Sequence, residues 1–380
     1  MGPLLFSLAL QVVLEKILAR AEVQNVGKLD FMVFYLDDGV LAGPDRIVFW
    51  FLREIQKELG DIGLSVNYGP GKSEAVLAAG GASVVDQSEF SDLDFNASGN
   101  FTILKTPIGT HEFCETYLQK KRMAAKVLLD RLPELDDPQI ALILLRHCMS
   151  FCKMGYNVRI VPADLQSETL RDFDQDVRIA FASAVGVHPD DEAWRRACRK
   201  VAFGGLGLRR ASEFADAAFI SSLGACAELA SSIDAAFRAS DNISSDHLTN
   251  AMLRLNTKLP ADAQLEPSLD QVPTQKDLTA KVERKSPDTD LLNPDLSTST
   301  KAHLQLVSMP NSGAWLNGYP DRAAKTSMGP SLFRIAVKRR LRMQILQEPS
   351  HCPSCGAGME MYADHALVCM CKQGPQDFKA

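Results

Sequence analysis

The chain has 380 residues, of which 46% are hydrophobic and 23% are charged. This balance is that of a folded globular protein, and it excludes a disordered, collagen-like or disulfide-dense chain. Its 41 Lys and Arg residues against 47 Asp and Glu residues give a formal net charge of −6. Any contact with nucleic acid must therefore come from local basic patches rather than from the chain as a whole.

The cysteines suggest a reducing compartment. Five of the nine are scattered through apolar segments, and the other four crowd into the last thirty residues. This distribution predicts reduced interior thiols and one metal site, and hence an intracellular protein of the nucleus or cytoplasm. No apolar run reaches the roughly 20 residues that span a bilayer, and no basic residue precedes the apolar stretch 3–14 as in a signal peptide. We therefore expect a chain that is neither secreted nor bound to a membrane.

The first 110 residues alternate helices with short strands. Apolar residues at helical spacing predict helices over 4–23 and 46–59. Between them, strands at 31–35 and 40–42 flank the turn 36–39, as in a hairpin. Further short strands are expected at 64–66 and 74–78, a loop at 82–100, and a last strand pair within 101–108.

Helices dominate the sequence after residue 111. They are predicted over 113–132, 138–154, 162–185, 190–201 and 211–230. Residues 231–300 are polar, with ten acidic and six basic side chains in 241–300, whereas 301–347 carry eight Lys and Arg residues and one acid. The predicted class is α+β, with five segments: 1–110, a helical region at 111–230, a polar linker with loose helices at 231–300, a basic helical segment at 301–347, and a Cys/His tail at 348–380.

Two adjacent carboxylates stand at the tip of the first predicted hairpin, in Tyr35-Leu36-Asp37-Asp38. Neighbouring carboxylates repel one another unless they are solvated or share a divalent cation. Asp37 and Asp38 thus form either an ordinary exposed turn or part of a site for a hard metal ion such as Mg²⁺.

The order of short motifs resembles the reverse transcriptases of non-LTR (LINE-type) retrotransposons. Residues 2–10 resemble the end of that family's motif B, Phe34–Asp38 its motif C, and Gly63–Asn67 with Lys72–Glu74 its motif D; 104–109 are a weaker match to the primer grip. Gly204–Arg209, Ser312–Leu316 and the closing Cys/His cluster resemble segments downstream of the polymerase. The resemblance covers nearly the whole chain, least in 231–300.

This resemblance implies an RNA-directed DNA polymerase that acts on RNA or DNA with deoxynucleotides and two Mg²⁺ ions. Asp37 would be a metal ligand, Asp38 an auxiliary one, and Lys72 a proton donor near the triphosphate; a solvated loop lysine is the alternative for Lys72. The partial palm would occupy residues 1–110 and a thumb-like region 111–230.

The sequence also departs from the family pattern. It begins inside motif B, so the aspartate of motif A is missing, and Asp92 and Asp94 fall in a polar loop that cannot easily replace it. We therefore expect a truncated polymerase that holds Mg²⁺ weakly and is inactive alone. The alternative is a non-enzymatic nucleic-acid-binding zinc-knuckle protein derived from a retroelement.

The closing cluster reads Cys352-x2-Cys355-x9-His365-x3-Cys369. Two thiolates from one turn and a His and a Cys one helical turn apart can converge tetrahedrally on Zn²⁺. Disulfide pairing is the alternative, and His351 and Cys371 are neighbouring candidates for one ligand each.

Two basic clusters are candidates for contacts with phosphate groups. A solvated helix face is the alternative for each, and Trp194 and Trp315 could stack on bases or lie in the core. The nucleic-acid-binding candidates are Arg195, Arg196, Arg199 and Lys200, with Arg209 and Arg210 nearby, and Arg334, Lys338, Arg339 and Arg340, with Arg342 nearby.

Overall fold

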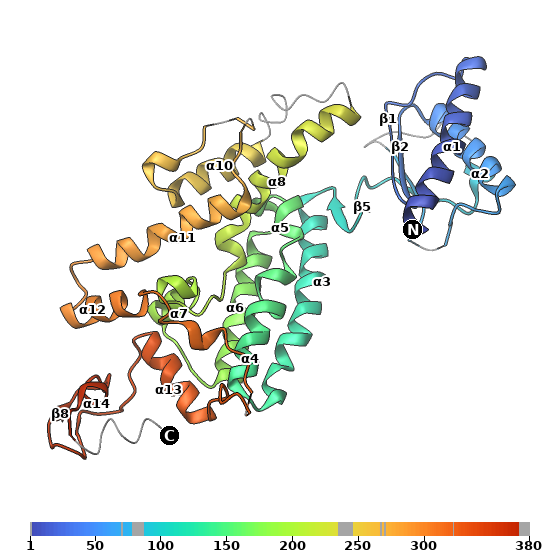
Figure 1. The fold of residues 1–380 in the computed structure, drawn as a ribbon. Helices are drawn as coiled ribbons and strands as arrows, with labels where there is room; N and C mark the ends of the chain where they lie inside the picture. The colour runs from blue at the N-terminus through green and yellow to red at the C-terminus, as the bar shows by residue number, and fades with distance from the viewer. Residues whose placement is uncertain are drawn as a thin grey trace. The chain divides into compact units, whose positions relative to one another are not determined.

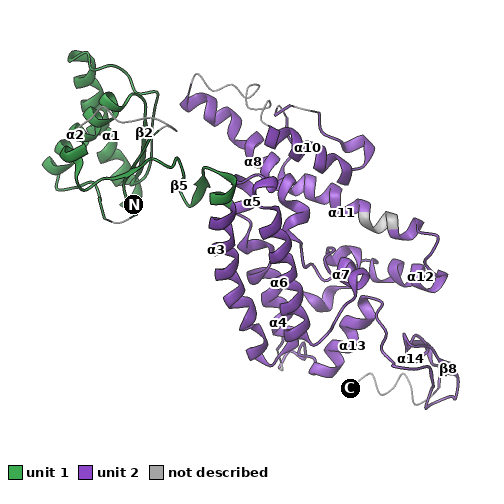
Figure 2. Cartoon of the chain, turned by 180° about the vertical axis from the view of Figure 1, so that it is seen from behind, with its two compact units in different colours: residues 1–114 green, residues 115–380 purple. Residues whose placement is uncertain are grey.

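The computed structural model describes residues 2–69, 71–77, 87–234, 246–266, 268–269, 271–321 and 323–371, and it leaves the side chains of 286–289 undescribed. The chain forms two compact units, residues 1–114 and 115–380 (Figures 1 and 2). This division differs from the five segments expected from the sequence, because the helices of residues 115–371 share cores across the predicted boundaries.

The first unit is built on two helices and a β-hairpin. Apolar side chains of α1 (Gly2–Val23) pack against α2 (Asp45–Asp61) and against the inner face of the hairpin. The hairpin pairs β1 (Phe31–Tyr35) with β2 (Asp38–Ala42) in antiparallel register, from Phe31 opposite Ala42 to Tyr35 opposite Asp38. This confirms the predicted hairpin, although its return strand begins at Asp38, two residues earlier than expected.

A second, smaller core lies on another face of α2. Phe49 packs there against Phe90 and Leu93, beside the short parallel pair β3 (Glu74–Val76) and β4 (Asp94–Asn96). A final hairpin joins β5 (Phe101–Ile103) to β6 (Thr106–Ile108) through Leu104 and Lys105, which both have positive φ.

The described strands form four separate two-stranded sheets, so the fold is a mixture of helices and small sheets. Residues 64–66, expected to be a strand, have no regular secondary structure, and part of the expected loop 82–100 forms β4. Residues 78 and 82–86 of the expected strand and loop lie outside the described residues.

The helix α1 corrects one expectation from the sequence. A stretch of 18 residues within this 22-residue helix has a mean hydropathy of 1.6, so the helix is long and apolar enough to cross a membrane by length and composition. Leu10, Leu14 and Ile17 are buried against the rest of the unit, whereas Leu4, Leu5, Leu8 and Val12 of the same helix are exposed.

The second unit is mainly helical, and its larger core contains apolar side chains from helices far apart in the sequence, including α6 (Ser167–Val185), α7 (Asp191–Ala197) and α13 (Pro330–Arg340). The predicted helix over 138–154 ends early, because its second half turns into a π-helical segment (Leu145–Met149) and Ser150 leaves the helical region of φ and ψ. The helices are α3 (His111–Asp130, which begins in the first unit), α4 (Pro138–Leu144), α5 (Asn157–Ile160), α6 (Ser167–Val185), α7 (Asp191–Ala197), α8 (Ala211–Ile233), α10 (Asp246–Lys258), α11 (Gln275–Leu292), α12 (Thr298–Val307), α13 (Pro330–Arg340) and α14 (His365–Val368).

The segment expected to be a polar linker forms part of this unit. Leu248, Met252 and Leu255 of α10, with Leu278 and Val282 of α11, pack on α8 in a core of their own. Figure 1 shows α10 and α11 beside α8. The spacing of Leu248, Met252 and Leu255 is that of an amphipathic helix, so the apolar signal was present in a segment whose overall composition is polar.

Candidate metal centre

The tail begins with a hairpin that carries two cysteines at its tip. Strands β7 (Ser350–His351) and β8 (Gly358–Met359) pair in antiparallel register. The turn between them closes with hydrogen bonds from the Cys352 N–H to the Ala357 carbonyl (2.8 Å) and from the Gly356 N–H to the Cys352 carbonyl (2.8 Å). Gly356 has φ of +73°, a conformation that glycine adopts at little cost. This glycine lets the chain turn back directly after Cys355.

The other two ligand candidates lie on the short helix α14 and directly after it. The ligand atoms of Cys352, Cys355, His365 and Cys369 all lie within 4.8 Å of one another. The sulfur atoms of Cys352 and Cys369 are 3.8 Å apart, and two Zn–S bonds of about 2.3 Å at a tetrahedral angle place their sulfurs about 3.8 Å apart. The structure thus brings together the four residues that the sequence spacing selects.

The remaining pair lies closer than a bound zinc ion requires. The Cys355 sulfur is 3.0 Å from Nε2 of His365, whereas a tetrahedral centre separates such atoms by about 3.5 Å. Cys355 is exposed and His365 is half-buried, so both side chains have room to separate by this small amount. The donor set and its spacing therefore fit zinc.

Backbone donors favour the metal-binding form of one thiol. Hydrogen bonds from the N–H groups of Ser354 and Cys355 lower the pKa of Cys352 to about 6. A thiolate is the form that binds Zn²⁺. The turn between β7 and β8 thus stabilises negative charge on the Cys352 sulfur at neutral pH.

The alternatives raised by the sequence do not form the centre. All nine cysteines are free thiols, including those of the tail. The group of ligand atoms in the described residues contains neither His351 nor Cys371. The arrangement has four protein ligands, which is typical of structural zinc sites, whereas catalytic sites keep one position open for water or substrate.

Two arginines attach the centre to the helical body. Arg342 donates to both carboxylate oxygens of Asp364 (2.9 and 2.8 Å), and Arg339 contacts the same carboxylate at 3.2 Å. Arg342 also donates to the hydroxyl of Ser299 (2.7 Å) and lies over the ring of Tyr362 at 4.0 Å. Although partial burial raises it, these ion pairs hold the pKa of Asp364 below its ordinary value. Asp364 precedes the ligand His365, so the contacts fix the backbone that presents the imidazole.

The Asp37–Asp38 pair lies at the turn of the β1–β2 hairpin. Both residues are exposed, and Leu36 between Tyr35 and Asp37 has φ of +58°. In the part of the chain that the structure describes, neither carboxylate belongs to a group of three or more His, Cys, Asp or Glu side chains that could hold a metal. Lys72 is exposed in the turn before β3. The structure does not bring Lys72 and the two carboxylates into any described contact.

The first basic cluster is engaged in ion pairs with helices of its own unit. Asp290 of α11 accepts from Arg195 (2.8 Å) and Arg199 (2.5 Å), and Glu283 pairs with Lys200 and, at 3.3 Å, with Arg209. Nearer in the sequence, Arg196 pairs with Glu192 and Arg210 with Glu213. In this conformation the cluster is not the open solvated face that one alternative supposed.

The second basic cluster is divided between structural contacts and the surface. Arg340 is buried and donates to three backbone carbonyls, those of Gly205, Ser312 and Val201, and burial lowers its pKa to about 10. Arg334 donates to the carbonyl of Val185 at 3.0 Å. Arg339 is committed to Asp364, which leaves Lys338 half-exposed on the same helix.

Arg340 also explains two motifs that the sequence singled out. Its guanidinium joins the glycine-rich segment 204–209 to segment 312–316, and Gly313 lies directly against it, since a Cβ there would be 2.8 Å from the guanidinium. Trp194 and Trp315 belong to the apolar core, where they lie against Phe181 and Phe333 respectively. These tryptophans are therefore core residues in this structure.

Sequence reasoning missed the residues that support the centre. Asp364 and Tyr362 lie between the ligands, but nothing in their spacing marks them as partners of Arg342. The one available signal was the excess of Lys and Arg just before the cluster, which we interpreted as either a site for phosphate or a solvated helix face. Comparison with known proteins adds no identification: no family model matches the chain, and no curated protein or solved structure shows significant similarity to it.

Proposed function

We propose that this chain is a nucleic-acid-binding protein with a structural zinc centre, related to the reverse transcriptases of non-LTR retrotransposons. The observation that carries the proposal is the convergence of Cys352, Cys355, His365 and Cys369 within 4.8 Å. A closed set of four ligands supplies folding free energy rather than an open catalytic position. Its attachment to the Arg-rich end of α13 places the centre beside cations, a combination that suits a nucleic-acid-binding tail.

Polymerisation is the second candidate function, and the β1–β2 hairpin favours it. Antiparallel pairing brings Tyr35 opposite Asp38, so the two carboxylates of the motif C resemblance stand at the end of a hairpin packed on α1 and α2. Such a hairpin suits the presentation of metal ligands in a polymerase palm. Two-metal transfer also needs carboxylates from other segments, and the described residues supply none next to Asp37 and Asp38.

The test of the zinc centre is metal analysis of the purified chain. We expect about one zinc ion per chain in the parent protein and none in the Cys352→Ser/Cys355→Ser variant. The control is Cys148→Ser/Cys226→Ser, which removes two exposed thiols elsewhere and should keep the metal. Equal zinc content in the parent and the Cys352→Ser/Cys355→Ser variant would contradict the centre.

The test of nucleic-acid binding is filter binding of a labelled 20-nucleotide uridine RNA across a salt series. We expect binding whose logarithmic affinity falls linearly with the logarithm of salt concentration, since Lys and Arg contacts release condensed counterions. The matching DNA strand distinguishes a preference for RNA from binding to any single strand. The absence of binding to both strands at low salt would refute this part of the proposal.

A further inference from the structure

The two halves of α11 contact the second unit in different ways. In the first half, Leu278 and Val282 are buried in the apolar core that α11 forms with α8 and α10. In the second half, the described contacts are the ion pairs of Glu283 and Asp290 and hydrogen bonds from Lys285 to the carbonyls of Thr257 and Leu259, and Leu292 at the end of the helix is 81% exposed. Apolar burial thus anchors the first half, while polar and ionic contacts hold the second.

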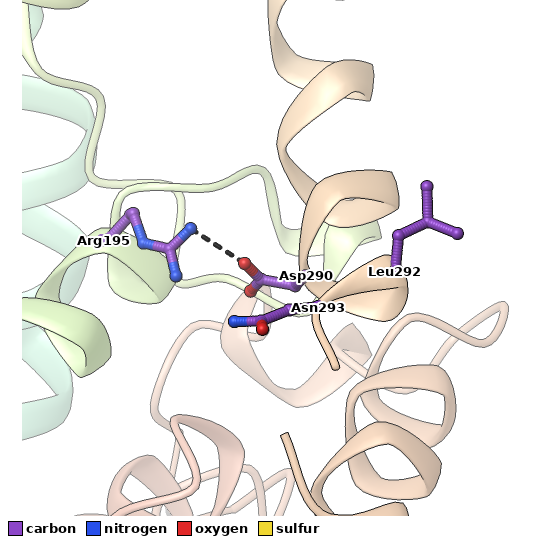
Figure 3. Close-up of a pocket in the computed structure, with 4 residues that line it drawn as sticks. All are labelled: Arg195, Asp290, Leu292 and Asn293. Atoms are coloured by element: carbon purple, nitrogen blue, oxygen red, sulfur yellow. Dashed lines mark hydrogen bonds and ion pairs between the residues drawn. The ribbon is translucent and has the colours of Figure 1, made fainter. Parts of the chain in front are cut away.

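The ionic half lies on the basic cluster of residues 195–209. Glu283 and Asp290 are seven residues apart, two helical turns, so they face the same side and are separated by about 10 Å along the axis. Glu283 meets Lys200 and Arg209, and Asp290 meets Arg195 and Arg199. Figure 3 shows Asp290 and Asn293 toward Arg195 at a shallow pocket, with Leu292 pointing away from it.

Several cations share few carboxylates in this contact. Among the described ion pairs, Glu192, Glu283 and Asp290 are contacted by five cations (Arg195, Arg196, Arg199, Lys200 and Arg209). Carboxylates and phosphodiester oxygens accept the same charge-assisted hydrogen bonds from Arg and Lys. A phosphate chain could therefore take the places of Glu283 and Asp290.

We propose that Arg195, Arg199, Lys200 and Arg209 form a phosphate-binding site for single-stranded nucleic acid that the carboxylates of Glu283 and Asp290 occupy in this conformation. The inference rests on the proposed function, because it names a site and a regulation for the same ligand. Nucleic acid displaces the C-terminal half of α11, while Leu278 and Val282 keep the helix attached. The helix acts as an internal competitor that weakens binding.

The test removes the two competing carboxylates and measures RNA binding. Glu283→Gln/Asp290→Asn keeps the size and an acceptor oxygen of each side chain and removes both negative charges. We expect this variant to bind 20-nucleotide uridine RNA about tenfold more tightly at low salt, with a salt slope steeper by about 1.4 if two phosphate contacts are gained. Adding Arg195→Gln/Arg199→Gln to the same variant should cancel the gain.

A charge-matched control separates the site from the overall charge. Glu228→Gln/Asp262→Asn removes two exposed carboxylates of the same unit and should leave RNA affinity near that of the parent. If the parent binds RNA, and if Glu283→Gln/Asp290→Asn and Glu228→Gln/Asp262→Asn bind it with the same affinity as each other, the proposed phosphate-binding site is refuted. The proposed function stands in that case. If neither the parent nor any variant binds RNA, both proposals fall.

A second measurement uses the unaltered protein, because the double variant leaves Arg199 buried without its carboxylate partner. Hydrogen exchange of the parent chain is followed with and without the uridine RNA. We expect faster amide exchange in residues 283–292 when RNA is present, since this half of α11 leaves its ionic contacts. Unchanged or slower exchange there, with RNA bound, would overturn the proposal.

Discussion

At the scale of single residues, Asp174 of α6 is a buried carboxyl that accepts hydrogen bonds from the start of the long helix α8. It accepts hydrogen bonds from the N–H groups of Ala211 (2.6 Å) and Ser212 (3.1 Å) and from the Ser212 hydroxyl (2.5 Å). Desolvation outweighs these bonds and raises the pKa of Asp174 to about 6, against an ordinary 3.8. The native state therefore binds a proton more tightly than the unfolded chain does.

This raised pKa predicts a pH dependence of stability. Between about pH 4 and pH 6 the native state retains a proton that the unfolded state has released, so the free energy of unfolding falls as pH rises through that window. Relative to Asp174→Asn, which does not titrate, the parent should lose about 1 to 1.5 kcal/mol of stability between pH 5 and pH 7.5. Urea denaturation of both proteins at the two pH values measures this difference, and parallel pH profiles would contradict the prediction.

Arg342 is the residue whose loss should loosen the zinc centre without removing a ligand. Arg342→Gln removes the hydrogen bonds to both carboxylate oxygens of Asp364 and the stacking on Tyr362. The backbone before His365 is then held less firmly. Supporting residues of this kind affect metal affinity by about tenfold or more. Competition with a chromophoric zinc chelator should show a loss of about that size.

The matched control for Arg342 is Lys338→Gln on α13, which removes one positive charge and no described contact with Asp364. This variant should compete with the chelator as the parent does. Equal zinc affinity in Arg342→Gln and Lys338→Gln would show that the arginine does not position the centre.

The residue scale also marks the limit of sequence reasoning about this site. The four zinc ligand candidates lie within 18 residues, and their spacing alone selects them. The partner of Arg199 is Asp290, 91 residues further along the chain. A basic run looks the same in sequence whether its cations face water or a distant carboxylate, so the ion pairs of residues 195–209 could not be predicted.

At the scale of elements, helices and strands with strong apolar periodicity were predicted well, whereas the helices of 231–300 were expected only as loose parts of a linker and not as parts of a core. The hairpin at 31–42 and the helix over 4–23 have many apolar residues in regular spacing, and both are present. The helices α10 and α11 carry fewer apolar residues among many acids and serines, so the overall polarity of 231–300 obscured a local pattern that buries Leu255 completely.

A pair of leucines on α10 tests whether this segment is part of the folded core. Leu255 is fully buried, whereas its near neighbour Leu253 is 62% exposed. Leu255→Ala should lower the free energy of unfolding of the chain by about 2–5 kcal/mol, because it leaves a cavity between α10 and α8. Leu253→Ala, the same chemical change on the same helix, should alter it by no more than about 0.5 kcal/mol.

Chemical denaturation followed by circular dichroism measures both variants. A small and equal effect of the two substitutions would mean that α10 does not pack on α8 in solution, and would restore the interpretation of residues 231–300 as a loose linker.

At the scale of the whole molecule, the centre that the structure assembles and the chemistry that the motifs resemble lie in different units. The zinc ligand candidates belong to residues 115–380, and the Asp37–Asp38 hairpin belongs to residues 1–114. Each unit has cores of its own, so zinc binding and any Mg²⁺ binding at the hairpin are separable properties.

The last prediction concerns polymerisation by the whole chain. Asp37 and Asp38 are exposed, and no third ligand-bearing side chain joins them in the described residues. Two Mg²⁺ ions need several carboxylates to hold them about 3.5–4 Å apart and to stabilise the charge of the transition state. We therefore expect the zinc-loaded chain to incorporate no deoxythymidine on a poly-A template with an oligo-dT primer and Mg²⁺, and Asp37→Asn to give the same result. Incorporation by the parent that is lost in Asp37→Asn would show that the hairpin is a working catalytic site, with its missing ligands supplied by residues that are not in contact with it in this conformation.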